Sequence, residues 1–224
     1  MRADGTKGDI FKPAVTFTIR RSKGGGTPLS SILLASGSPR RLDLLRSLGL
    51  CVEVAPSGYD EPTLPNLAPA DLASYHAGEK LATVLRAREQ RVDLPTLAAD
   101  TVVDVDGVAL GKPRNDQEAA RMLRMLSGRD HLVHTAFALR VLGCEQIAER
   151  QSTRVRFYPL DANEIAEYVA TGEPFDKAGA YGIQGRAAAL IEAIDGDFYT
   201  VMGLPLARVI RALRRLGFML PETN

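Results

Sequence analysis

The residues with the clearest chemical potential lie in the segment SILLASGSPRRLDLLRSLG, residues 31–49. Its apolar start predicts a buried strand and its leucine stripe predicts a helix, with Ser36 in the loop between them. Arg40 and Arg41 fall in the first helical turn, where cations are unfavourable beside the positive end of the helix dipole. A bound phosphate would relieve this repulsion through hydroxyl, loop N–H and guanidinium groups. The segment therefore predicts an anion site, although tolerated surface charges explain the arginines equally well.

Further residues suited to phosphate chemistry are spread along the chain. Glu61 follows Asp60 in a proline-rich loop, Lys80 lies within a helical pattern, and Lys112 stands in the loop GKP. Asp100 lies inside the apolar run LAADTVVDV, where an unpaired carboxylate is costly, so it is the strongest functional candidate. This mixture suits phosphoryl chemistry, in which cations hold the phosphates, carboxylates hold Mg²⁺ and one acid orients or deprotonates water.

The elements that must hold these residues alternate irregularly between strand and helix. Strand patterns occupy residues 31–35, 51–55, 97–105, 108–110, 132–141 and 153–157. Helical patterns occupy residues 39–49, 70–89, 115–128, 161–172 and 205–216. A last hairpin is expected from strands at 187–194 and 198–202. This order predicts an α/β (mixed α+β) fold with a mixed sheet and flanking helices.

The composition excludes several classes of function. The chain has 224 residues, of which 45% are hydrophobic and 25% charged, and a net charge of +1. This balance offers no general attraction to a nucleic acid polymer or a membrane, and no apolar run approaches the roughly 20 residues of a membrane span. Cys51 and Cys144 lack a CxxC partner, so we expect reduced core thiols and a cytoplasmic location. The three histidines form no metal-binding motif.

Two segments differ from this ordinary globular pattern. Residues 1–28 end in a run of glycines and indicate a flexible N-terminal extension, which leaves residues 29–220 as the folded domain. The segment DKAGAYGIQG places glycines at positions 179, 182 and 185. Glycines at this density allow a backbone to approach a flat or charged ligand, although surface loops use them as often.

Several of these motifs together resemble the Maf family of nucleoside triphosphate pyrophosphatases. The resemblance rests on LASGSPRR, GYDEP, the pair EK, ADTVV with DGVALGKP, and DKAGAYGIQG followed by VMGLPL, in register over residues 31–216. It implies a fold similar to that of inosine triphosphate pyrophosphatases, with a long mixed sheet and two lobes around a cleft. It also implies cleavage of a nucleoside triphosphate to the monophosphate and pyrophosphate with a divalent metal, Mg²⁺ or Mn²⁺.

The resemblance assigns a role to most of the residues singled out above. Asp100 becomes the catalytic acid or base, and Glu61 and Asp100 become the metal ligands. The remaining residues become phosphate ligands: Ser36, Arg41, Lys80 and Lys112. A solvated loop acid is the ordinary alternative for Glu61, and a satisfied structural acid is the alternative for Asp100.

Three further positions bear on the substrate. Arg40, Thr101 and Gln184 resemble the residues of the family branch that acts on dTTP and UTP. The branch that acts on 7-methyl-GTP has the sequence SPW, with tryptophan at the position of Arg40. The Gln184 amide can present a donor and an acceptor together to the edge of a pyrimidine. Thr101 and Gln184 could instead bond the neighbouring loop backbone. The resemblance therefore implies removal of unwanted pyrimidine nucleotides, including modified ones, and leaves a homodimer open.

Two other functions are kept as alternatives. The sequence VVDVDGV matches the DxDG[TV] loop of haloacid-dehalogenase-type phosphatases, with Asp104 as nucleophile and Asp106 as acid or base. Against it, a short strand and GKP follow where such enzymes continue into a helix. The Maf family also resembles proteins named for arrest of septum formation, so a nucleotide-binding regulator of septation with little turnover is the second alternative.

Overall fold

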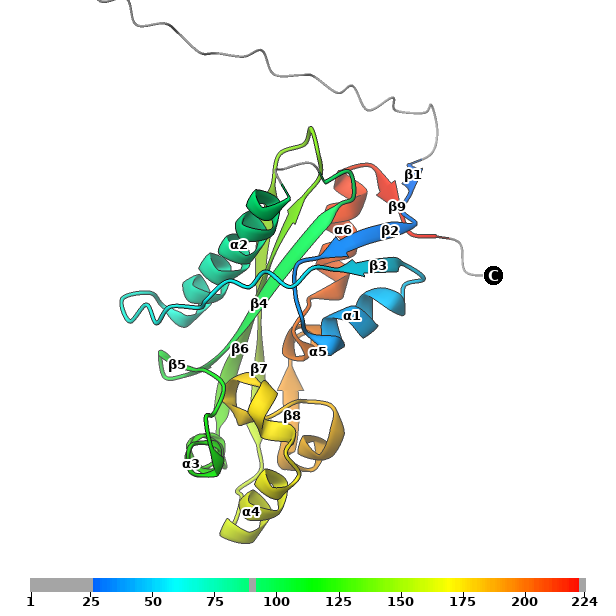
Figure 1. Ribbon diagram of the computed structural model, residues 1–224. Coiled ribbons are helices and arrows are strands. Elements are labelled where there is room, and N and C mark those ends of the chain that lie inside the picture. Colours follow the sequence, from blue (N-terminus) through cyan, green and yellow to red (C-terminus); the bar gives the residue numbers. More distant parts are fainter. Residues whose placement is uncertain (1–25, 89–91, 222–224) are drawn as a thin grey trace, which may run out of the picture.

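The computed structural model describes residues 26–88 and 92–221. Most of the expected N-terminal extension, residues 1–25, therefore lies outside the described residues. Its last residues, Thr27–Pro28 (β1), pair in parallel with Phe218–Met219 (β9), so the two ends of the described chain lie side by side (Figure 1).

Within the described residues, a mixed sheet of seven strands forms the centre of the molecule (Figure 1). The strands are β2 (Ser31–Leu34), β3 (Cys51–Val54), β4 (Thr96–Val105), β5 (Val108–Leu110), β6 (Asp130–Arg140), β7 (Ile147–Phe157) and β8 (Ile191–Asp195). Their order is β3-β2-β4-β6-β7-β8, with β5 added beside β4. Strand β2 runs parallel to β3 and β4, and the other pairs are antiparallel. The predicted mixed sheet is thereby confirmed.

Helices cover both faces of this sheet. The α-helices are α1 (Pro39–Arg46), α2 (Pro69–Ala87), α3 (Asp116–Leu126), α4 (Ala162–Ala170), α5 (Phe198–Met202) and α6 (Leu206–Arg215). Three 3₁₀ segments follow α4: η1 (Glu173–Asp176), η2 (Ala178–Ala180) and η3 (Gly185–Leu190). Because side chains alternate along a strand, neighbouring residues of β2 face different helices: Leu33 packs with α2, whereas Leu34 packs with α1 and α6.

The apolar core divides the molecule into two lobes. One lobe packs α1, α2 and α6 against β2 and the first half of β4. The other packs α3, α4 and η2 against the second half of β4 and against β6 and β7 (Figure 1). Strand β4 runs through both, with Leu97 in the first core and Val105 in the second. Asp100 and Thr101 therefore lie where the lobes meet.

Two expectations about local structure are wrong. The hairpin expected from strands at 187–194 and 198–202 does not form, because residues 187–190 lie in η3 and the first strand begins only at Ile191. The residues at 198–202 form helix α5, because the Asp197 side chain accepts a hydrogen bond from the Thr200 N–H at 2.7 Å and caps the helix. The aromatic and β-branched residues that favoured a strand are overridden by this cap. Cys51 and Cys144 are free thiols but not core residues: Cys51 is exposed on edge strand β3, and Cys144 is half-buried.

No described helix is long and apolar enough to cross a membrane.

His131 is a buried titratable residue of the second lobe. Its side chain is 3% exposed, its Nε2 lies 2.7 Å from the Tyr181 hydroxyl, and its ring packs edge-on against Phe157 and Tyr181. Nδ1 has no hydrogen-bond partner within the part of the chain that the structure describes. Burial lowers the pKa of His131 from 6.5 to about 4, which outweighs the opposing effect of Asp130.

This lowered pKa predicts a loss of stability in acid. The unfolded chain binds a proton at His131 below about pH 6.5 and the folded chain only below about pH 4, so the free energy of unfolding falls between these values, by about 3 kcal/mol in total. Urea unfolding at pH 7, 6 and 5 measures the slope. We expect His131→Gln to be less stable at pH 7 but to lose less stability between pH 7 and 5. An equal slope in both proteins would contradict the prediction.

Candidate active site

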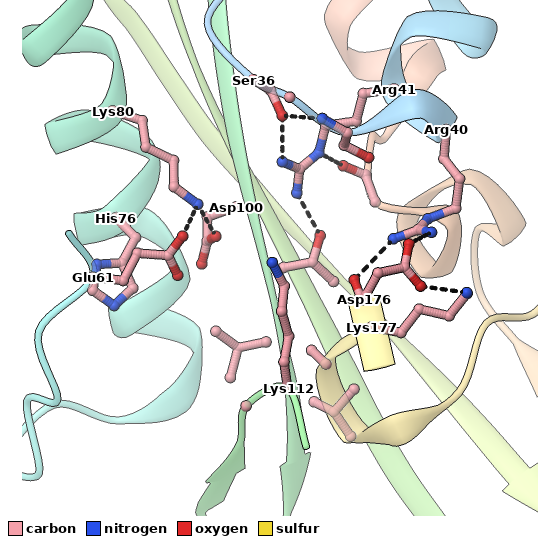
Figure 2. A pocket seen from close by; sticks show the side chains of 18 of the residues that line it. Ser36, Arg40, Arg41, Glu61, His76, Lys80, Asp100, Lys112, Asp176 and Lys177 are labelled. Atoms are coloured by element: carbon pink, nitrogen blue, oxygen red, sulfur yellow. Dashed lines mark hydrogen bonds and ion pairs between the residues drawn. The ribbon is translucent and has the colours of Figure 1, made fainter. Parts of the chain in front are cut away.

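A cleft of about 840 Å³ lies between the two lobes. It is bounded by the loop before α1, by α2, by the middle of β4, and by the 3₁₀ segments that follow α4 (Figure 2). All nine residues singled out from the sequence line it: Ser36, Arg40, Arg41, Glu61, Lys80, Asp100, Thr101, Lys112 and Gln184. The structure thus brings the predicted site residues together, while their individual roles stay predictions.

Two buried charges of the cleft, Asp100 and Lys80, form a carboxylate–lysine–carboxylate group with the more exposed Glu61. Lys80 Nζ, from α2, lies 2.6 Å from Asp100 Oδ1 and 2.7 Å from Glu61 Oε1 (Figure 2). Asp100 is 5% exposed, and such a charge is costly to bury unless it is paired. Although partial burial raises the pKa of Glu61, the hydrogen bond and charge of Lys80 outweigh it and leave that pKa below its ordinary value.

Helix α2 can place Lys80 here because its face toward the sheet is small. Ala73 and Ala77 pack against Val102 and Ala136, which lets the helix lie close to β4 and β6. Asp100 and Val102 share one face of β4, since they are two residues apart. Lys80, which the helix itself does not require, therefore lies beside Asp100. This pairing offsets the predicted cost of burying the Asp100 carboxylate.

Arg41 lies in the first turn of α1, beside Ser36, and is 8% exposed. Its guanidinium donates to the Gly203 carbonyl at 2.7 Å, to Ser36 Oγ at 3.1 Å and to Thr101 Oγ1 at 3.1 Å. Burial lowers the pKa of Arg41, and nearby Asp100 opposes this effect. Arg41 therefore organises the loop before α1 and ties it to β4, and direct contact with phosphate stays a prediction for it.

Thr101 continues this hydrogen-bond chain into the sheet. Its hydroxyl lies 2.9 Å from Thr135 Oγ1, and Thr135 in turn donates to the Thr200 carbonyl at 2.7 Å. Since the Thr135 proton is used there, Thr101 donates to Thr135 and accepts from Arg41. Thr101 thus has no donor left for a ligand, and it can affect substrate choice by positioning Arg41 or through its remaining lone pair.

Lys112 and Gln184 approach the cleft from the second lobe. Lys112 follows β5 and points toward the centre of the site (Figure 2). Among residues 26–88 and 92–221, no carboxylate pairs with it. Gln184 is exposed and stands directly before η3. Both side chains are therefore available to a ligand in this structure.

The sequence interpretation gave no individual role to several residues that line the same cleft, among them Asp176, Lys177, Tyr59 and His76. Asp176 pairs with Arg40, Nη1 to Oδ2, at 2.7 Å, and Lys177 Nζ lies 2.6 Å from the other Asp176 oxygen. Tyr59 and His76 lie beside Glu61, with the tyrosine hydroxyl 3.4 Å from His76 Nδ1. The first two residues open the quoted DKAGAYGIQG motif, so the motif itself was the signal that could have identified them.

The glycines of this motif serve the protein's own packing. A Cβ at Gly179, where φ is +69°, would lie 2.9 Å from Val103, and a Cβ at Gly185, where φ is +80°, would lie 2.9 Å from Glu173. A Cβ at Gly182 would collide with the Lys177 side chain. These contacts explain the glycines without a ligand, so the idea that they admit one is not supported.

The residues of the phosphatase alternative are engaged elsewhere. Asp104 accepts a hydrogen bond from the Gly107 N–H at 2.7 Å and lies 3.1 Å from His134 Nε2. Asp106, at φ +53° in the hairpin turn, pairs with Arg129 at 2.5 Å. Neither aspartate is among the residues that line the cleft. The geometry therefore does not favour a phosphatase built on these two residues.

Two carboxylates of the cleft bear on a possible metal site. No group of three or more His, Cys, Asp or Glu side chains within the described ranges is arranged to hold a metal ion. Two carboxylates, Glu61 and Asp100, nevertheless converge on one cationic nitrogen. Mg²⁺ and Mn²⁺ are held by one or two carboxylates together with water and substrate phosphates, so this pair fits such an ion.

Comparisons with known proteins agree on one family. A family profile described as Maf-like protein matches residues 31–216. A protein of Thermus thermophilus named dTTP/UTP pyrophosphatase is 50% identical over 195 residues, covering 87% of this chain and 98% of its own. Proteins of the same name from Symbiobacterium thermophilum and Pelotomaculum thermopropionicum are 49% and 46% identical, over 85% of this chain and 96% and 98% of theirs.

Solved structures give a weaker similarity. A HAM1 protein from Coxiella burnetii aligns with a TM-score of 0.44 and 16% identity, over 84% of this chain and 100% of its own. A dITP/XTP pyrophosphatase from Mycobacterium abscessus aligns with a TM-score of 0.40 and 20% identity, over 83% and 97%. Scores of this size carry no conclusion about function.

Proposed function

This chain belongs to the family of Maf-like proteins, and we propose that it hydrolyses dTTP and UTP to the nucleoside monophosphate and pyrophosphate. The observation that carries the proposal is the convergence of Asp100, Glu61 and Lys80 in a cleft that also holds Arg40 and Lys112. The relatives with this name cover most of the chain, and the same cleft contains every residue of the pyrimidine-type pattern.

The carboxylates provide the chemistry in this proposal. Glu61 and Asp100 would hold Mg²⁺ or Mn²⁺, which neutralises phosphate charge when bound. Asp100 orients the attacking water and accepts its proton, because it is the buried acid at the centre of the cleft. The water attacks the α-phosphorus, the bond from that phosphorus to the bridging oxygen breaks, and pyrophosphate leaves.

The cations bind the triphosphate. Lys80 and Lys112 approach from opposite sides of the cleft, and the loop of Ser36, held by Arg41, supplies N–H and hydroxyl groups (Figure 2). Such preorganised donors stabilise the charge that develops on the leaving pyrophosphate. Gln184 presents its amide to the base, and Arg40 binds beside it.

A panel of substrates tests the proposal. dTTP, UTP, 5-modified pyrimidine triphosphates, 7-methyl-GTP and a generic phosphate ester are incubated with Mg²⁺, and pyrophosphate is resolved from orthophosphate. We expect pyrophosphate from dTTP and UTP at rates well above those from 7-methyl-GTP. Orthophosphate from the generic ester would point instead to the phosphatase, and absence of turnover with every substrate would point to the regulator.

The cellular role follows from the reaction. We propose that the protein removes unwanted or modified pyrimidine triphosphates from the nucleotide pool in the cytoplasm, before polymerases can use them. A connection with cell division would then be indirect. A homodimer stays a prediction, and each step proposed here uses residues of one chain.

A further inference from the structure

A single carboxylate joins the two walls of the cleft at its opening. Asp176, at the end of η1, belongs to the second lobe, and Arg40, in the first turn of α1, belongs to the first. Arg40 donates to Asp176 Oδ2 at 2.7 Å, and its second nitrogen lies 3.4 Å from the Asp176 carbonyl (Figure 2). The guanidinium therefore has two anchors on one residue of the opposite wall.

The same carboxylate holds a second cation of the cleft. Lys177 Nζ lies 2.6 Å from Asp176 Oδ1 and donates to the Glu173 carbonyl at 2.6 Å. Its side chain is 14% exposed and fills the space that Gly182 leaves open. Because Lys177 is fixed by these contacts, it fixes Asp176 in turn, and the position of Arg40 is determined by a chain of contacts that begins inside the second lobe.

The charge of Asp176 makes a purely electrostatic role implausible on physical grounds. A carboxylate at the opening repels a triphosphate. Partial burial raises the pKa of Asp176, but the hydrogen bonds from Lys177 and Arg40 lower it by more. Asp176 therefore stays ionised at neutral pH. A residue that only repelled the substrate would be unfavourable at this position. Asp176 has a second effect, because it holds the long side chain of Arg40 in one position and so reduces the conformational freedom of that side chain.

We propose that Asp176 is a positioning residue, whose carboxylate ties Arg40 to Lys177 across the opening of the cleft and so fixes where Arg40 meets the nucleotide. The kinetic consequences of this inference rest on the proposed function, whereas its structural consequences rest on the contacts alone. In this proposal Asp176 acts through Arg40 and not on the reacting atoms.

The kinetic test uses Asp176→Asn in the full chain, with dTTP and UTP as substrates. The variant keeps the shape of the side chain but weakens its hold on both cations. We expect KM to rise about 5-fold to 10-fold and kcat to change less than 2-fold, which are the effects of losing a charge-assisted contact that positions the substrate. If Asp176 acted only through its negative charge, its removal would lower KM for every triphosphate alike, and that result would overturn the proposal.

A second measurement does not depend on activity. Phenylglyoxal modifies accessible arginine side chains, and the rate at Arg40 is followed by tandem mass spectrometry in the absence of nucleotide. We expect this rate to rise several-fold in Asp176→Asn, with buried Arg41 as the internal reference. An unchanged rate would overturn the proposal even if KM had risen. If the unmodified protein hydrolyses no triphosphate, the proposed function fails, and the labelling rate still decides the role of Asp176.

A matched control and a conservative variant complete the design. Asp43→Asn removes the same charge from the exposed side of α1, outside the cleft, and should change neither KM nor the labelling of Arg40. Asp176→Glu retains the carboxylate and should recover part of the KM and of the protection of Arg40. An equal effect of Asp43→Asn and Asp176→Asn would show that net charge alone is responsible and would overturn the proposal.

Discussion

Asp100→Asn is expected to reduce the hydrolysis of dTTP by about 1,000-fold while nucleotide binding survives. The amide has nearly the shape of the carboxylate, so it fits the buried site on β4, and its oxygen can still accept from Lys80. It cannot accept a proton from water at neutral pH, and it is a weaker metal ligand. Single-turnover rates and the dissociation constant of dTTP, both measured with Mg²⁺, separate the chemical step from binding.

The matched control for this prediction is Asp104→Asn. Asp104 lies on the same strand and loses the same charge, but its contacts are to His134 and to the Gly107 N–H, outside the cleft. We expect it to keep the rate of the unmodified protein. The reverse pattern, with Asp104→Asn inactive and Asp100→Asn active, would contradict the pyrophosphatase mechanism and support the phosphatase alternative. Retained turnover in Asp100→Asn alone would mean that another group activates the water.

The sequence could predict the contents of the site because the cost of burying charge is visible in it. Asp100 stands inside an apolar run, so it required a partner or a function, whereas Lys80 alone is typical of a solvated helix residue. In the structure they are partners, with Nζ and Oδ1 2.6 Å apart. The family resemblance added the order of the motifs, and the lobes bring those motifs to one cleft.

The part that the sequence could not predict depends on contacts between distant segments. Asp176 beside Lys177 has the appearance of an ordinary solvated loop pair, and its partner Arg40 is 136 positions away. Arg41 looked like a free phosphate ligand, but three acceptors from different segments surround it. The glycines at 179, 182 and 185 suggested a ligand, because the side chains that fill their space are invisible to local spacing.

Helix α5 shows the same limit at the level of secondary structure. The residues FYTVM favour a strand by propensity, yet they form a helix because Asp197 caps it and Gly203, at φ +107°, ends it. Thr153 holds Asp197 from β7, with its hydroxyl accepting from the Asp197 N–H at 3.0 Å. The turn is therefore fixed by a strand that lies far away in the sequence, and a short segment follows its tertiary contacts instead of its propensity.

Lys80→Met is expected to destabilise the protein and to make its stability depend on divalent metal. Methionine keeps the length and helix propensity of the side chain, but it leaves Asp100, 5% exposed, facing Glu61 without a counter-ion. Breaking a buried pair in this way costs about 2–3 kcal/mol here, because Glu61 is half-exposed and can move toward solvent. Hydrolysis of dTTP should fall as well, since a cation is lost from the triphosphate site.

Metal and a second lysine variant give this prediction its controls. Millimolar Mg²⁺ or Mn²⁺ should raise the thermal unfolding temperature of Lys80→Met by more than that of the unmodified protein. The ion would replace the ammonium group beside the two carboxylates, and a chelator should reverse the gain. Lys112→Met removes a cleft cation that no described carboxylate pairs with, so it should lower activity without lowering stability. If Lys80→Met and Lys112→Met were equally stable and equally indifferent to metal, the two carboxylates would not form the cation site, and the metal ligands would have to be sought elsewhere in the cleft.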